Sequence, residues 1–570
     1  MKVPSEAKIV FGEQNIDDVE SHVDTYANFL YFNGITAKTP FGIYVDRSPE
    51  CLFVMLAAIK IGVPFMPIDI SLPYDRIHFM IQDSNIKLLI TVKKYEQQFN
   101  ECQTICIDDI VDNPTPFSSV QQKNEIIYIL YTSGSSGNPK GVEVRRASFF
   151  AFIDGVSKII DFSPRKCIAC LTTMSFDIFF LESIMALYKG LTVVLASDEE
   201  SVNPRLMSRI LINNDVNMVQ MTPSRVQLLI SYDSDLKCLS NMTEILVGGE
   251  PFPHKLLSTL KCRTNAKIYN MYGPTETTIW STISELTYKN EIDIGVPIDG
   301  TRIYIVDEGL NPVSEGIIGE ICIAGKGLAK GYINNSKLTA EKFLTLSSPI
   351  NEQVYRTGDF GMFQDGVYMC FGRKDNQIKI RGYRVELEEI ENVITQLDGI
   401  DQVVVSLIKQ ETGDALFAFY TSKESINNHE ILTYLKRILP NYMIPSYYIK
   451  LGNIPQTNSG KINRTQIIET YNKMCEMEKL YGIMEKPQVS QNQSIEEQIL
   501  GIIAEHTDTH DEITPKSDFS SLGLDSISFI TVIVALEEKF EFVFDDDMLL
   551  FAAYPNIEAM ISYVKSKIRR

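Results

Sequence analysis

The feature that most constrains this chain is an alternation of short apolar strands and amphipathic helices over some 270 residues. One repeat shows the pattern. Gly42–Val45 is predicted as a strand, Ser48–Glu50 opens a helix with a serine cap, a first-turn proline and an early acid, and Phe65–Ile68 is the next strand. This alternation predicts doubly wound α/β sheets. Ligands of such sheets bind in loops beyond the carboxyl ends of the strands, so those loops are the candidate sites.

The same alternation predicts further elements as far as residue 247. Helical periodicity covers Val19–Leu30, Pro73–Asp83, Phe149–Ile160, Phe179–Tyr188 and Leu206–Asn213. Short apolar runs that favour strands are Leu88–Thr91, Ile168–Thr172, Thr192–Ala196, Met218–Met221 and Ile245–Val247. We therefore expect a large α/β core in the first half of the chain.

The chain changes character beyond Thr301. Short strands between glycine-rich turns predict a small β unit, and a compact α+β piece follows, with helices at Leu387–Leu397 and Glu430–Leu439. Residues 470–493 are polar and are predicted to be a linker. The last unit, 494–570, has an all-α, four-helix pattern and carries 15 acidic against 6 basic residues. The chain is thus expected to contain several folded units.

A loop rich in serine and glycine follows a predicted buried strand, Ile126–Tyr131. Its glycines allow several backbone N–H groups to point at one anion, and its hydroxyls and Lys140 add donors suited to phosphate. The loop is not a Walker sequence, because Pro139 and Gly141 stand where that pattern needs glycine and serine or threonine. It indicates either a phosphate site of another kind or a plain polar turn.

Composition narrows the classes of function. The formal net charge is −20, which argues against a nucleic-acid partner, because phosphate backbones bind basic surfaces. The N-terminus has no apolar signal core, and no stretch has the apolar length of a membrane helix. The ten cysteines are dispersed. We therefore expect a cytoplasmic protein with no nucleic-acid and no membrane partner.

An ordered series of short motifs runs through the chain to about Arg464. It consists of the loop Thr132–Gly141, Phe176–Asp177, Asn270–Glu276, Gly319–Ile321, Tyr355–Asp359, Gly372–Gly382, Leu439–Pro445 and Ser459–Lys461. The series closely resembles the adenylation domains of nonribosomal peptide synthetases, which belong to the adenylate-forming superfamily with acyl-CoA synthetases and luciferases. The departures are small: Phe360 stands where leucine is usual, and Ser136 where threonine is usual.

The last unit adds a second resemblance. The stretch Phe519–Ile527 resembles a peptidyl carrier protein, in which Ser526 would carry 4′-phosphopantetheine at a helix N-terminus. An isolated Asp525–Ser526 pair would otherwise be read as a plain helix cap. The two resemblances imply an adenylation core at 1–373, its C-terminal lobe at 374–469, a linker at 470–493 and a carrier domain at 494–570.

The resemblance also implies the chemistry. A carboxylate would be converted to an acyl-adenylate with loss of pyrophosphate, through a transition state that needs fixed donors and cations around the α-phosphate. Lys461 would reach the carboxylate and the α-phosphate, Thr275 would contact the α-phosphate, and Glu276 would hold Mg²⁺. Asp375 would lie at the hinge of the C-terminal lobe. A lone loop lysine is otherwise a solvated side chain.

The same resemblance implies an ATP site. Asp359 would accept both ribose hydroxyls, for which a turn-capping aspartate is the alternative, and Tyr272 would lie near the adenine. Gly248, Gly249 and Glu250 would border the adenine and substrate pockets. The predicted nucleotide-binding residues are Thr132, Ser133, Gly134, Ser135, Ser136, Gly137, Lys140, Gly249, Glu250, Asn270, Tyr272, Gly273, Asp359 and Arg373.

Asp177 bears on the class of substrate. In the family an aspartate at this place pairs with the α-ammonium of an amino acid, whereas the residue could also be the N-cap of the next helix. The other substrate-binding positions are Ile178, Leu181, Gln220, Leu246, Gly248, Met271, Ile279 and Trp280. Most are large and apolar, so the pocket fills itself and leaves room for little or no side chain. The set resembles that of glycine-activating members, with alanine as the nearest rival.

The sequence therefore predicts an enzyme that activates an amino acid, favouring glycine, as aminoacyl-AMP with ATP and Mg²⁺. It would transfer the aminoacyl group to its own phosphopantetheine thiol, for nonribosomal peptide or antibiotic biosynthesis. Its partners would be a phosphopantetheinyl transferase and condensation or acyl-transfer enzymes acting in trans, since no HHxxxDG or GxSxG motif occurs. The alternatives are an acyl- or aryl-CoA ligase of the same fold, an aminoacyl-tRNA synthetase and a non-catalytic carrier scaffold.

Overall fold

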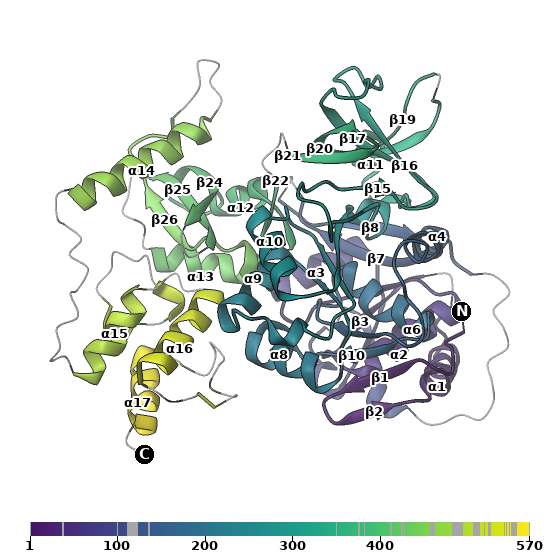
Figure 1. The fold of residues 1–570 in the computed structure, drawn as a ribbon, viewed down its shortest axis with the longest axis horizontal. Coiled ribbons are helices and arrows are strands. Elements are labelled where there is room, and N and C mark those ends of the chain that lie inside the picture. The colour runs from purple at the N-terminus through teal and green to yellow at the C-terminus, as the bar shows by residue number, and fades with distance from the viewer. Residues whose placement is uncertain are drawn as a thin grey trace. The chain divides into compact units, whose positions relative to one another are not determined.

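The computed structural model of the protein forms two compact units (Figure 1). The first comprises residues 1–134 and 138–384, and the second residues 135–137 and 385–570. The structure describes residues 2–568 except 37–38, 100, 111–122, 135–136, 349, 374–376, 381, 411–412, 423–425, 427, 456–461, 481–493, 506–512, 518, 523–525, 541, 543, 546–547, 549–553 and 555. None of the described helices combines the length and the apolar character that a membrane crossing requires.

A nine-stranded sheet forms the larger half of the first unit. Its order is β15 (Val296–Pro297), β14 (Thr282–Glu285), β13 (Lys267–Tyr272), β12 (Glu244–Gly248), β11 (Met218–Met221), β9 (Cys167–Cys170), β10 (Thr192–Leu195), β1 (Lys8–Phe11) and β2 (Gln14–Ile16). The strands from β13 to β1 are parallel, and antiparallel strands close both edges. The parallel centre requires crossover helices, which explains the strand–helix alternation of the sequence.

A seven-stranded sheet forms the other half. Its order is β18 (Gly331–Tyr332), β8 (Lys140–Arg145), β7 (Ile126–Thr132), β4 (Phe65–Pro67), β3 (Phe41–Tyr44), β5 (Leu88–Thr91) and β6 (Gln103–Cys106). The strands from β7 to β6 are parallel, whereas β8 and β18 are antiparallel to their neighbours. The two sheets confirm the doubly wound α/β prediction for the core.

Helices pack against these sheets. They are α1 (Val19–Phe32), α2 (Pro49–Ile61), α3 (Tyr74–Asp83), α4 (Arg146–Val156), α5 (Ile178–Phe180), η3 (Leu181–Met185), α6 (Ala186–Tyr188), α7 (Asp198–Val202), α8 (Pro204–Asn213), α9 (Pro223–Tyr232) and α10 (His254–Arg263). In α2 every residue except Glu50 and Lys60 is buried. A helix that is apolar on all sides belongs in an interior. The buried cluster of α2 accordingly includes residues of both sheets, such as Tyr128 of β7 and Ile168 of β9.

A smaller sheet completes the first unit. It contains β16 (Thr301–Val306), β17 (Gly319–Gly325), β20 (Gln353–Gln364), β19 (Phe343–Thr345) and β21 (Val367–Arg373), with α11 (Ser336–Lys342) beside it. This confirms the predicted small β unit. After it come β22 (Gln377–Ile380) and β23 (Tyr383–Glu386), which form a separate two-stranded sheet. The sequence analysis predicted no strand between residues 373 and 384.

The second unit contains the α+β piece and the helical C-terminus. The α+β piece has α12 (Leu387–Ile394), α13 (Asn428–Ile438), α14 (Arg464–Leu480) and a three-stranded sheet of β24 (Ile400–Gln410), β25 (Gly413–Ser422) and β26 (Tyr447–Lys450). The described C-terminal elements are α15 (Ile495–Glu505), the 3₁₀ turn η7 (Phe519–Leu522), α16 (Ser526–Phe540) and α17 (Ile557–Ile568). Their apolar faces share one buried cluster, which includes Ile499, Phe529 and Val564. The predicted all-α character is confirmed.

The structure describes only the first part of the predicted linker at 470–493. Helix α14 continues to Leu480, so the first part of that stretch is helical, and residues 481–493 lie outside the described residues. The polar composition that suggested a linker is also compatible with an exposed helix, because lysine, glutamate and methionine are good helix formers. The structure also adds strands that were not predicted, among them β1, β2, β6, β8 and β13.

Candidate active site

Three neighbouring parallel strands supply one wall of a pocket. Gln220 of β11 lies opposite Leu246 of β12, and Gly248 of β12 lies opposite Met271 of β13. Side chains alternate between the faces of a sheet, so Leu246 and Gly248 share a face and their partners lie on that face as well. All four positions fall at or near the carboxyl ends of the strands, where an α/β sheet binds its ligands.

A helix and a turn supply the rest of the pocket. Ile178 begins α5, and Leu181 begins η3, a π-helical segment of the kind often found at functional sites. Both belong to one buried cluster with Leu246, Met271, Ile279 and Trp280. The structure thus brings the predicted pocket residues together. The six residues of this cluster are at most 6% exposed.

The turn that presents Trp280 is strained. Thr278 and Ile279 have φ of 65° and 67°, the left-handed region that β-branched residues rarely adopt. Hydrogen bonds hold the turn, because the Thr278 hydroxyl donates to the Gly327 carbonyl at 2.7 Å. The tip of the Trp280 ring would lie 2.8 Å from a Cβ at Gly248, so only glycine fits there. The indole therefore packs directly against the wall of the pocket.

Asp177 is a buried carboxylate without an ion-pair partner among the described residues. It precedes α5 and makes no helix-cap bond, but the backbone N–H of Ile178, the first residue of the helix, donates to its carboxylate. Burial raises the pKa of Asp177 to about 6, although a hydrogen bond from Thr275 and the charge of Lys379 both lower it. A carboxylate in this setting is poised to accept a cation that a ligand brings.

Glu276, in the 3₁₀ turn η5 (Thr275–Thr277), is also fully buried, but cations surround it. Arg384 Nη1 lies 2.9 Å from both carboxylate oxygens, Tyr332 donates to Oε1 at 2.6 Å, and Lys140 Nζ lies 3.8 Å from Oε1. Burial alone would raise the pKa of Glu276, but Arg384 and Lys140 outweigh it and lower the pKa to about 2. Glu276 is therefore ionised at all physiological pH values.

Asp359 of β20 forms a third acidic position. Its Oδ2 accepts from the Tyr272 hydroxyl at 2.6 Å, and Arg373 Nη1 lies 3.3 Å from its Oδ1. The same Arg373 nitrogen donates to the Thr357 carbonyl at 2.7 Å. Among the described residues, the Asp359 carboxylate accepts from Tyr272 and Arg373 and from no backbone N–H of its own turn. A carboxylate has about four lone-pair sites, so two fixed donors orient Asp359 and leave it able to accept ribose hydroxyls.

The predicted phosphate loop connects β7 to β8 and therefore joins two antiparallel strands, with Thr132 opposite Lys140. Ser133 is buried, and its hydroxyl donates to the Arg384 carbonyl at 2.7 Å. Lys140 reaches Glu276 and lies over the Tyr332 ring. The loop thus places one cation beside the carboxylate that was predicted to hold metal.

The remaining predicted ATP residues follow β12 and β13. Glu250 Oε2 accepts from the backbone and hydroxyl of Ser224 at 2.9 and 2.7 Å and so fixes the start of α9. Asn270 donates to the Asp293 carbonyl at 2.8 Å. Gly249 follows β12 directly, and Gly273 follows β13, with a close approach to the turn that contains Ile279 and Trp280. They lie at the sheet edge where the pocket wall ends.

Some predicted residues lie outside the described ones. These are Ser135, Ser136, Asp375 and Lys461, and also Asp525 of the carrier motif. Conversely, Tyr332, Lys379 and Arg384 contribute to the site, and the sequence analysis gave them no role. The signal for two of them was present, because residues 373–384 carry an unusual density of basic side chains. Tyr332 had no such signal.

The described residues could hold Mg²⁺ only if other groups supplied most of its ligands. No group of three or more His, Cys, Asp or Glu in the described part of the chain is arranged to hold a metal ion. Mg²⁺ commonly binds one or two carboxylates and takes its other ligands from phosphate oxygens and water. Glu276, a hard oxygen ligand near Lys140, is suited to that arrangement when ATP supplies the phosphates.

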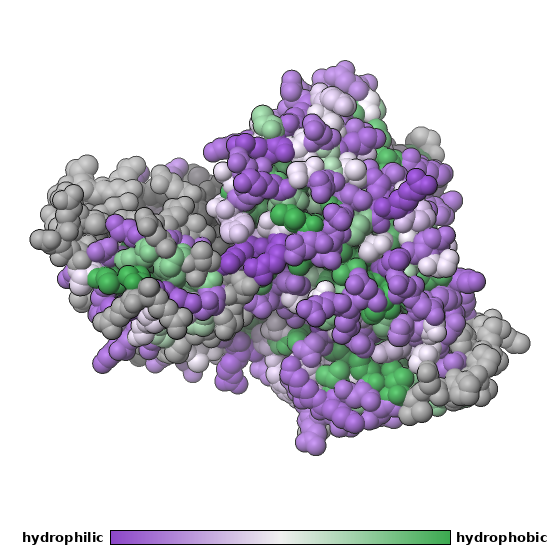
Figure 2. Space-filling model, turned by 60° about the horizontal axis from the view of Figure 1, so that its bottom comes forward, coloured by the Kyte–Doolittle hydropathy of each residue, from purple (hydrophilic) through white to green (hydrophobic). Residues whose placement is uncertain are grey.

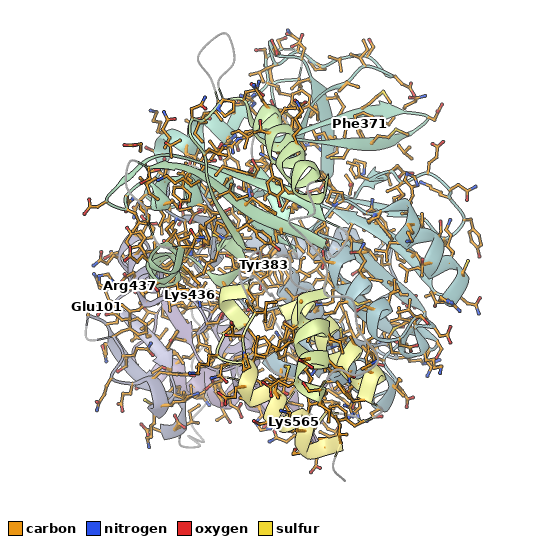
Figure 3. All side chains as sticks on the ribbon, turned by 90° about the vertical axis from the view of Figure 1, so that its left-hand side faces the viewer. Glu101, Phe371, Tyr383, Lys436, Arg437 and Lys565 are labelled. Carbon is orange, nitrogen blue, oxygen red and sulfur yellow. The ribbon has the colours of Figure 1, made fainter. Side chains whose placement is uncertain are left out.

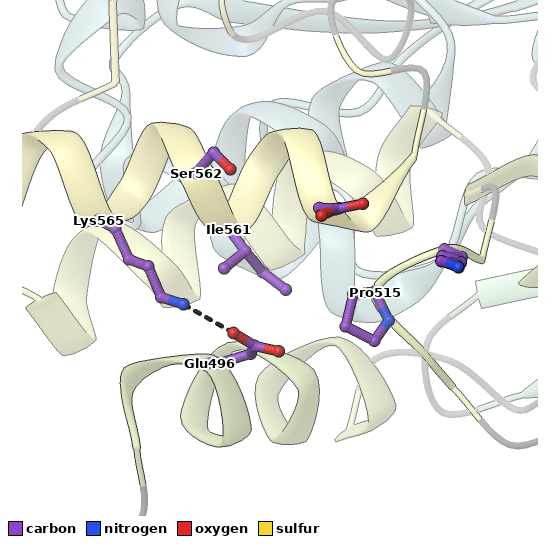
Figure 4. Close-up of a pocket in the computed structure, with 7 residues that line it drawn as sticks. Glu496, Pro515, Ile561, Ser562 and Lys565 are labelled. Carbon is purple, nitrogen blue, oxygen red and sulfur yellow. Dashed lines mark hydrogen bonds and ion pairs between the residues drawn. The ribbon is translucent and has the colours of Figure 1, made fainter.

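The carrier region offers a separate set of features. Ser526 is the first residue of α16, a helix of 15 residues, and helix N-termini favour phosphate groups. A pocket of about 330 Å³ lies between α15, α17 and Pro515 (Figure 4), and Lys565 pairs with Glu496 there at 2.7 Å. The pocket is lined by polar and charged side chains with Ile561 at its base. On the face of the molecule in Figure 2, hydrophilic residues predominate, with smaller hydrophobic areas between them.

Comparison with known proteins agrees with this geometry. Residues 4–333 match the family model of AMP-binding enzymes, residues 389–461 match the AMP-binding enzyme C-terminal domain, and residues 497–564 match the phosphopantetheine attachment site. The fold and the site thus define an adenylate-forming enzyme with a carrier domain. Since the first match covers more than half of the chain, the chain belongs to the AMP-binding enzyme family.

Its relatives include large synthetases. Tyrocidine synthase 1 of Brevibacillus parabrevis is 30% identical over 588 residues, which cover all of this chain and 52% of that protein. The dimodular nonribosomal peptide synthase of Bacillus subtilis (strain 168) is 34% identical over 465 residues, 79% of this chain and 19% of that protein. Bacitracin synthase 3 of Bacillus licheniformis is 33% identical over 473 residues, 81% of this chain and 7% of that protein. The chain thus spans about half of one relative and a small part of the others.

Solved structures share the fold. A holo nonribosomal peptide synthetase protein with adenylation and carrier domains, bound to a vinylsulfonamide inhibitor, gives a TM-score of 0.82 at 20% identity over 98% of this chain and 94% of that one. A holo four-domain nonribosomal peptide synthetase bound to AMP and glycine gives 0.60 at 26% identity over 98% and 41%. The chain is an AMP-forming ligase that uses ATP and Mg²⁺ and carries a phosphopantetheine attachment domain, and its relatives include nonribosomal peptide synthases.

Proposed function

We propose that the chain activates glycine as glycyl-AMP with ATP and Mg²⁺ and passes the glycyl group to the phosphopantetheine of its own carrier domain. The observation that carries the proposal is Asp177. A buried carboxylate with a raised pKa and no ion partner among the described residues would bind the α-ammonium of an amino acid. Gln220 adds a second acceptor, because its side-chain oxygen is buried without a partner among those residues.

The preference for glycine follows from the pocket walls. Trp280, Met271 and Ile279 are buried, and the indole packs against Gly248. The charged residues of the predicted pocket, Asp177 and Lys461, would face the ammonium and the carboxylate that every amino acid has, so a charged substrate side chain would find no partner. A related four-domain synthetase has been solved with AMP and glycine, which supports the same choice for this chain.

The catalytic roles form part of the same proposal. Lys461 would stabilise the charge that develops between the carboxylate and the α-phosphate, and Thr275 would contact the α-phosphate. Mg²⁺ bound to Glu276 would neutralise charge on the phosphates. Asp359, held by Tyr272 and Arg373, would fix the ribose. Ser526 would be the attachment residue of phosphopantetheine, and Asp375 the hinge.

The proposal extends to organisation and context. The domains would be the adenylation core at 1–373, its lobe at 374–469, the linker at 470–493 and the carrier at 494–570. The protein would act in the cytoplasm, in nonribosomal peptide or antibiotic biosynthesis. A phosphopantetheinyl transferase would modify it, and condensation or acyl-transfer enzymes would act in trans.

The test is substrate-dependent exchange between ATP and pyrophosphate, across the common amino acids and a panel of aryl and fatty acids. We expect a dominant glycine signal that Asp177→Ala abolishes, whereas Asp299→Ala, an exposed aspartate paired with Lys158, retains it. Mass spectrometry should then find glycine on the carrier of the wild-type chain and not on Ser526→Ala. Exchange with amine-free acids alone would favour a CoA ligase, and no exchange at all would favour a carrier scaffold.

A further inference from the structure

Two buried charged residues of the first unit, Arg47 and Glu182, have no part in the proposed function so far. Arg47 is 6% exposed and Glu182 is fully buried. Within the part of the chain that the structure describes, neither residue forms an ion pair. Removing a charge from water is costly, so a buried ion without an ion partner needs hydrogen bonds instead. Both residues make such bonds to one stretch of chain, Thr172–Glu182, which we call the pocket segment.

Arg47 lies in the loop between β3 and α2, at the carboxyl end of a strand of the seven-stranded sheet. Its guanidinium donates to three main-chain carbonyls at the carboxyl ends of β9 and β10 in the nine-stranded sheet, those of Cys170, Thr172 and Ala196. The guanidinium carbon also lies 5.7 Å from the centre of the Phe179 ring in α5. Arg47 therefore contacts both the start of the pocket segment and its helix, and it ties them to the second sheet.

Glu182 lies in η3 and closes the pocket segment from its other end. Its Oε2 accepts from the backbone N–H groups of Leu171 and Thr172, both at 2.8 Å, and its Oε1 accepts from the Thr172 hydroxyl at 2.7 Å. An ionised carboxylate suits three donors, because it only accepts hydrogen bonds. Burial raises the pKa of Glu182, whereas the Thr172 donors and the charges of Arg225 and Arg47 lower it. Arg47 thus supports the charge of the carboxylate with which it shares Thr172.

The two charged residues hold Thr172 at each of its polar atoms. Its carbonyl accepts from Arg47, and its N–H and its hydroxyl donate to Glu182. The two ends of the pocket segment are therefore joined through one residue. Between these ends the chain carries three of the predicted pocket residues, namely Asp177, Ile178 and Leu181.

Further contacts fix the first part of the pocket segment. The Thr173 hydroxyl donates to Asp69 Oδ2 at 2.9 Å. Phe176 packs edge-on against Tyr383, which is labelled in Figure 3, with ring centroids 4.6 Å apart. Asp177 itself has no ion partner among the described residues, so its position depends mainly on the backbone that carries it.

We propose that Arg47 and Glu182 are positioning residues for the substrate ammonium, because they fix the pocket segment and so hold the Asp177 carboxylate where the ammonium binds. This inference rests on the ammonium role of Asp177 in the proposed function. Hydrogen bonds between a carboxylate and an ammonium are short, and a displacement of about 1 Å can cost about 100-fold in rate. A loosened pocket segment should therefore weaken binding of the amino acid more than binding of ATP.

The test compares glycine with glycolate, which has a hydroxyl in place of the ammonium, by exchange between ATP and pyrophosphate. In Glu182→Gln an amide NH₂ replaces one of the two acceptor oxygens, and in Arg47→Lys a compact ammonium replaces the planar fork of donors. Each variant should raise the KM for glycine about tenfold and change the KM for ATP by less than about twofold. The preference for glycine over glycolate in kcat/KM should fall by about fivefold or more.

The matched control is Glu244→Gln. Glu244 is a buried acid at the amino end of β12, where it pairs with Lys166 at 2.6 Å, so it lies at the opposite end of the sheet from the pocket. This variant should lower the free energy of unfolding but leave the glycine preference unchanged. A purely structural role of Arg47 and Glu182 would give the same result in their variants, namely lower stability with an unchanged preference.

Thr172→Val provides a milder probe if a charged variant does not fold. It removes one of the three hydrogen bonds to Glu182 at nearly constant volume and should lower the glycine preference about threefold. If exchange identifies another amino acid as the substrate, the same comparison is made with that acid and its 2-hydroxy acid.

The possible outcomes separate this proposal from the proposed function. The wild-type chain should prefer glycine over glycolate, and Asp177→Asn should lose that preference. If both hold, an unchanged preference in Arg47→Lys, Glu182→Gln and Thr172→Val overturns the positioning roles and leaves the proposed function intact. If the wild-type chain shows no preference, the ammonium role of Asp177 is wrong, and the positioning roles are overturned with it.

Discussion

Glu276 and Asp177 are two buried carboxylates of the same unit with opposite electrostatic settings. Glu276 faces Arg384, Lys140 and the Tyr332 hydroxyl, and the pKa of Glu276 is lowered to about 2. Asp177 receives a hydrogen bond from Thr275 and has no ion partner among the described residues, so burial raises its pKa to about 6. One charge is neutralised by the protein, and the other is not.

The comparison distinguishes a carboxylate whose charge the fold itself neutralises from one whose charge remains available to a ligand. Removing an ion from water costs several kcal/mol, so a buried carboxylate without a cation destabilises the fold until a ligand supplies one. At Glu276 the fold itself supplies the cations. At Asp177 the cation is left to the substrate. Substitutions at the two sites should therefore have opposite effects on stability.

The largest effect is expected for Glu276→Gln. It removes the charge of the carboxylate that both Arg384 and Lys140 contact and should lower the free energy of unfolding by about 3–5 kcal/mol. Chemical denaturation measures this, with Glu285→Gln, an exposed glutamate on β14, as the control. Equal stability of Glu276→Gln and the wild type would mean that the two cations do not depend on this carboxylate.

Asp177→Asn should have the opposite sign. The folded pKa of about 6 lies above the unfolded value of 3.8, so stability falls as the pH rises between them. The amide should therefore stabilise the substrate-free chain by about 3 kcal/mol at pH 8 and about half that at pH 5. Denaturation of both chains at the two pH values measures the difference. A destabilised Asp177→Asn at pH 8 would show that the carboxylate is already neutralised.

The pH dependence of substrate binding sharpens the same contrast. Below pH 6 protonation of Asp177 should raise the KM for the amino acid about tenfold per pH unit, since the ammonium of the substrate stays charged. Exchange assays between pH 5 and pH 8 provide the measurement. In Asp177→Asn the weak residual KM should not change over this range. A flat profile in the wild-type chain would remove Asp177 from substrate binding.

The smallest effect is expected at the pocket wall, where two methionines allow a matched comparison. Met271 lies in the buried cluster of the pocket face, whereas Met221 lies in the cluster on the other side of the sheet. Met271→Ala should raise the kcat/KM ratio of alanine to glycine about tenfold, because one methyl group is weakly discriminated. Met221→Ala should leave this ratio unchanged. An equal shift in both variants would point to a general loosening of the core.

The sequence was sufficient for most of the core but not for its isolated strands. Parallel strands such as β11 and β12 are short apolar runs between helices, and their predicted limits agree with the structure within about one residue. Strand β8 was missed, because Lys140–Arg145 mixes charged and apolar residues and pairs only through the turn after β7. The hairpin of β22 and β23 was missed for a similar reason.

The residues of the site also fall into those that the sequence could predict and those that it could not. The pocket residues on β11, β12 and β13 could be predicted, because parallel strands end at one edge and the family motifs mark that edge. The pairing of Arg384 with Glu276 could not, since the two residues are 108 positions apart and only the fold joins them. The hydrogen bond from the Tyr332 hydroxyl to Glu276 could not be predicted either, because no local sequence pattern indicates it.

The most direct test of the account compares glycine with glycolate, which replaces the ammonium by a hydroxyl and keeps the carboxylate. Both acids should be assayed by exchange between ATP and pyrophosphate, in the wild-type chain and in Asp177→Asn. We expect the wild type to prefer glycine by at least about 100-fold in kcat/KM, because a buried charge left unpaired is costly. In Asp177→Asn this preference should largely disappear. Similar rates for the two acids in the wild-type chain would contradict the claim that Asp177 binds the substrate ammonium.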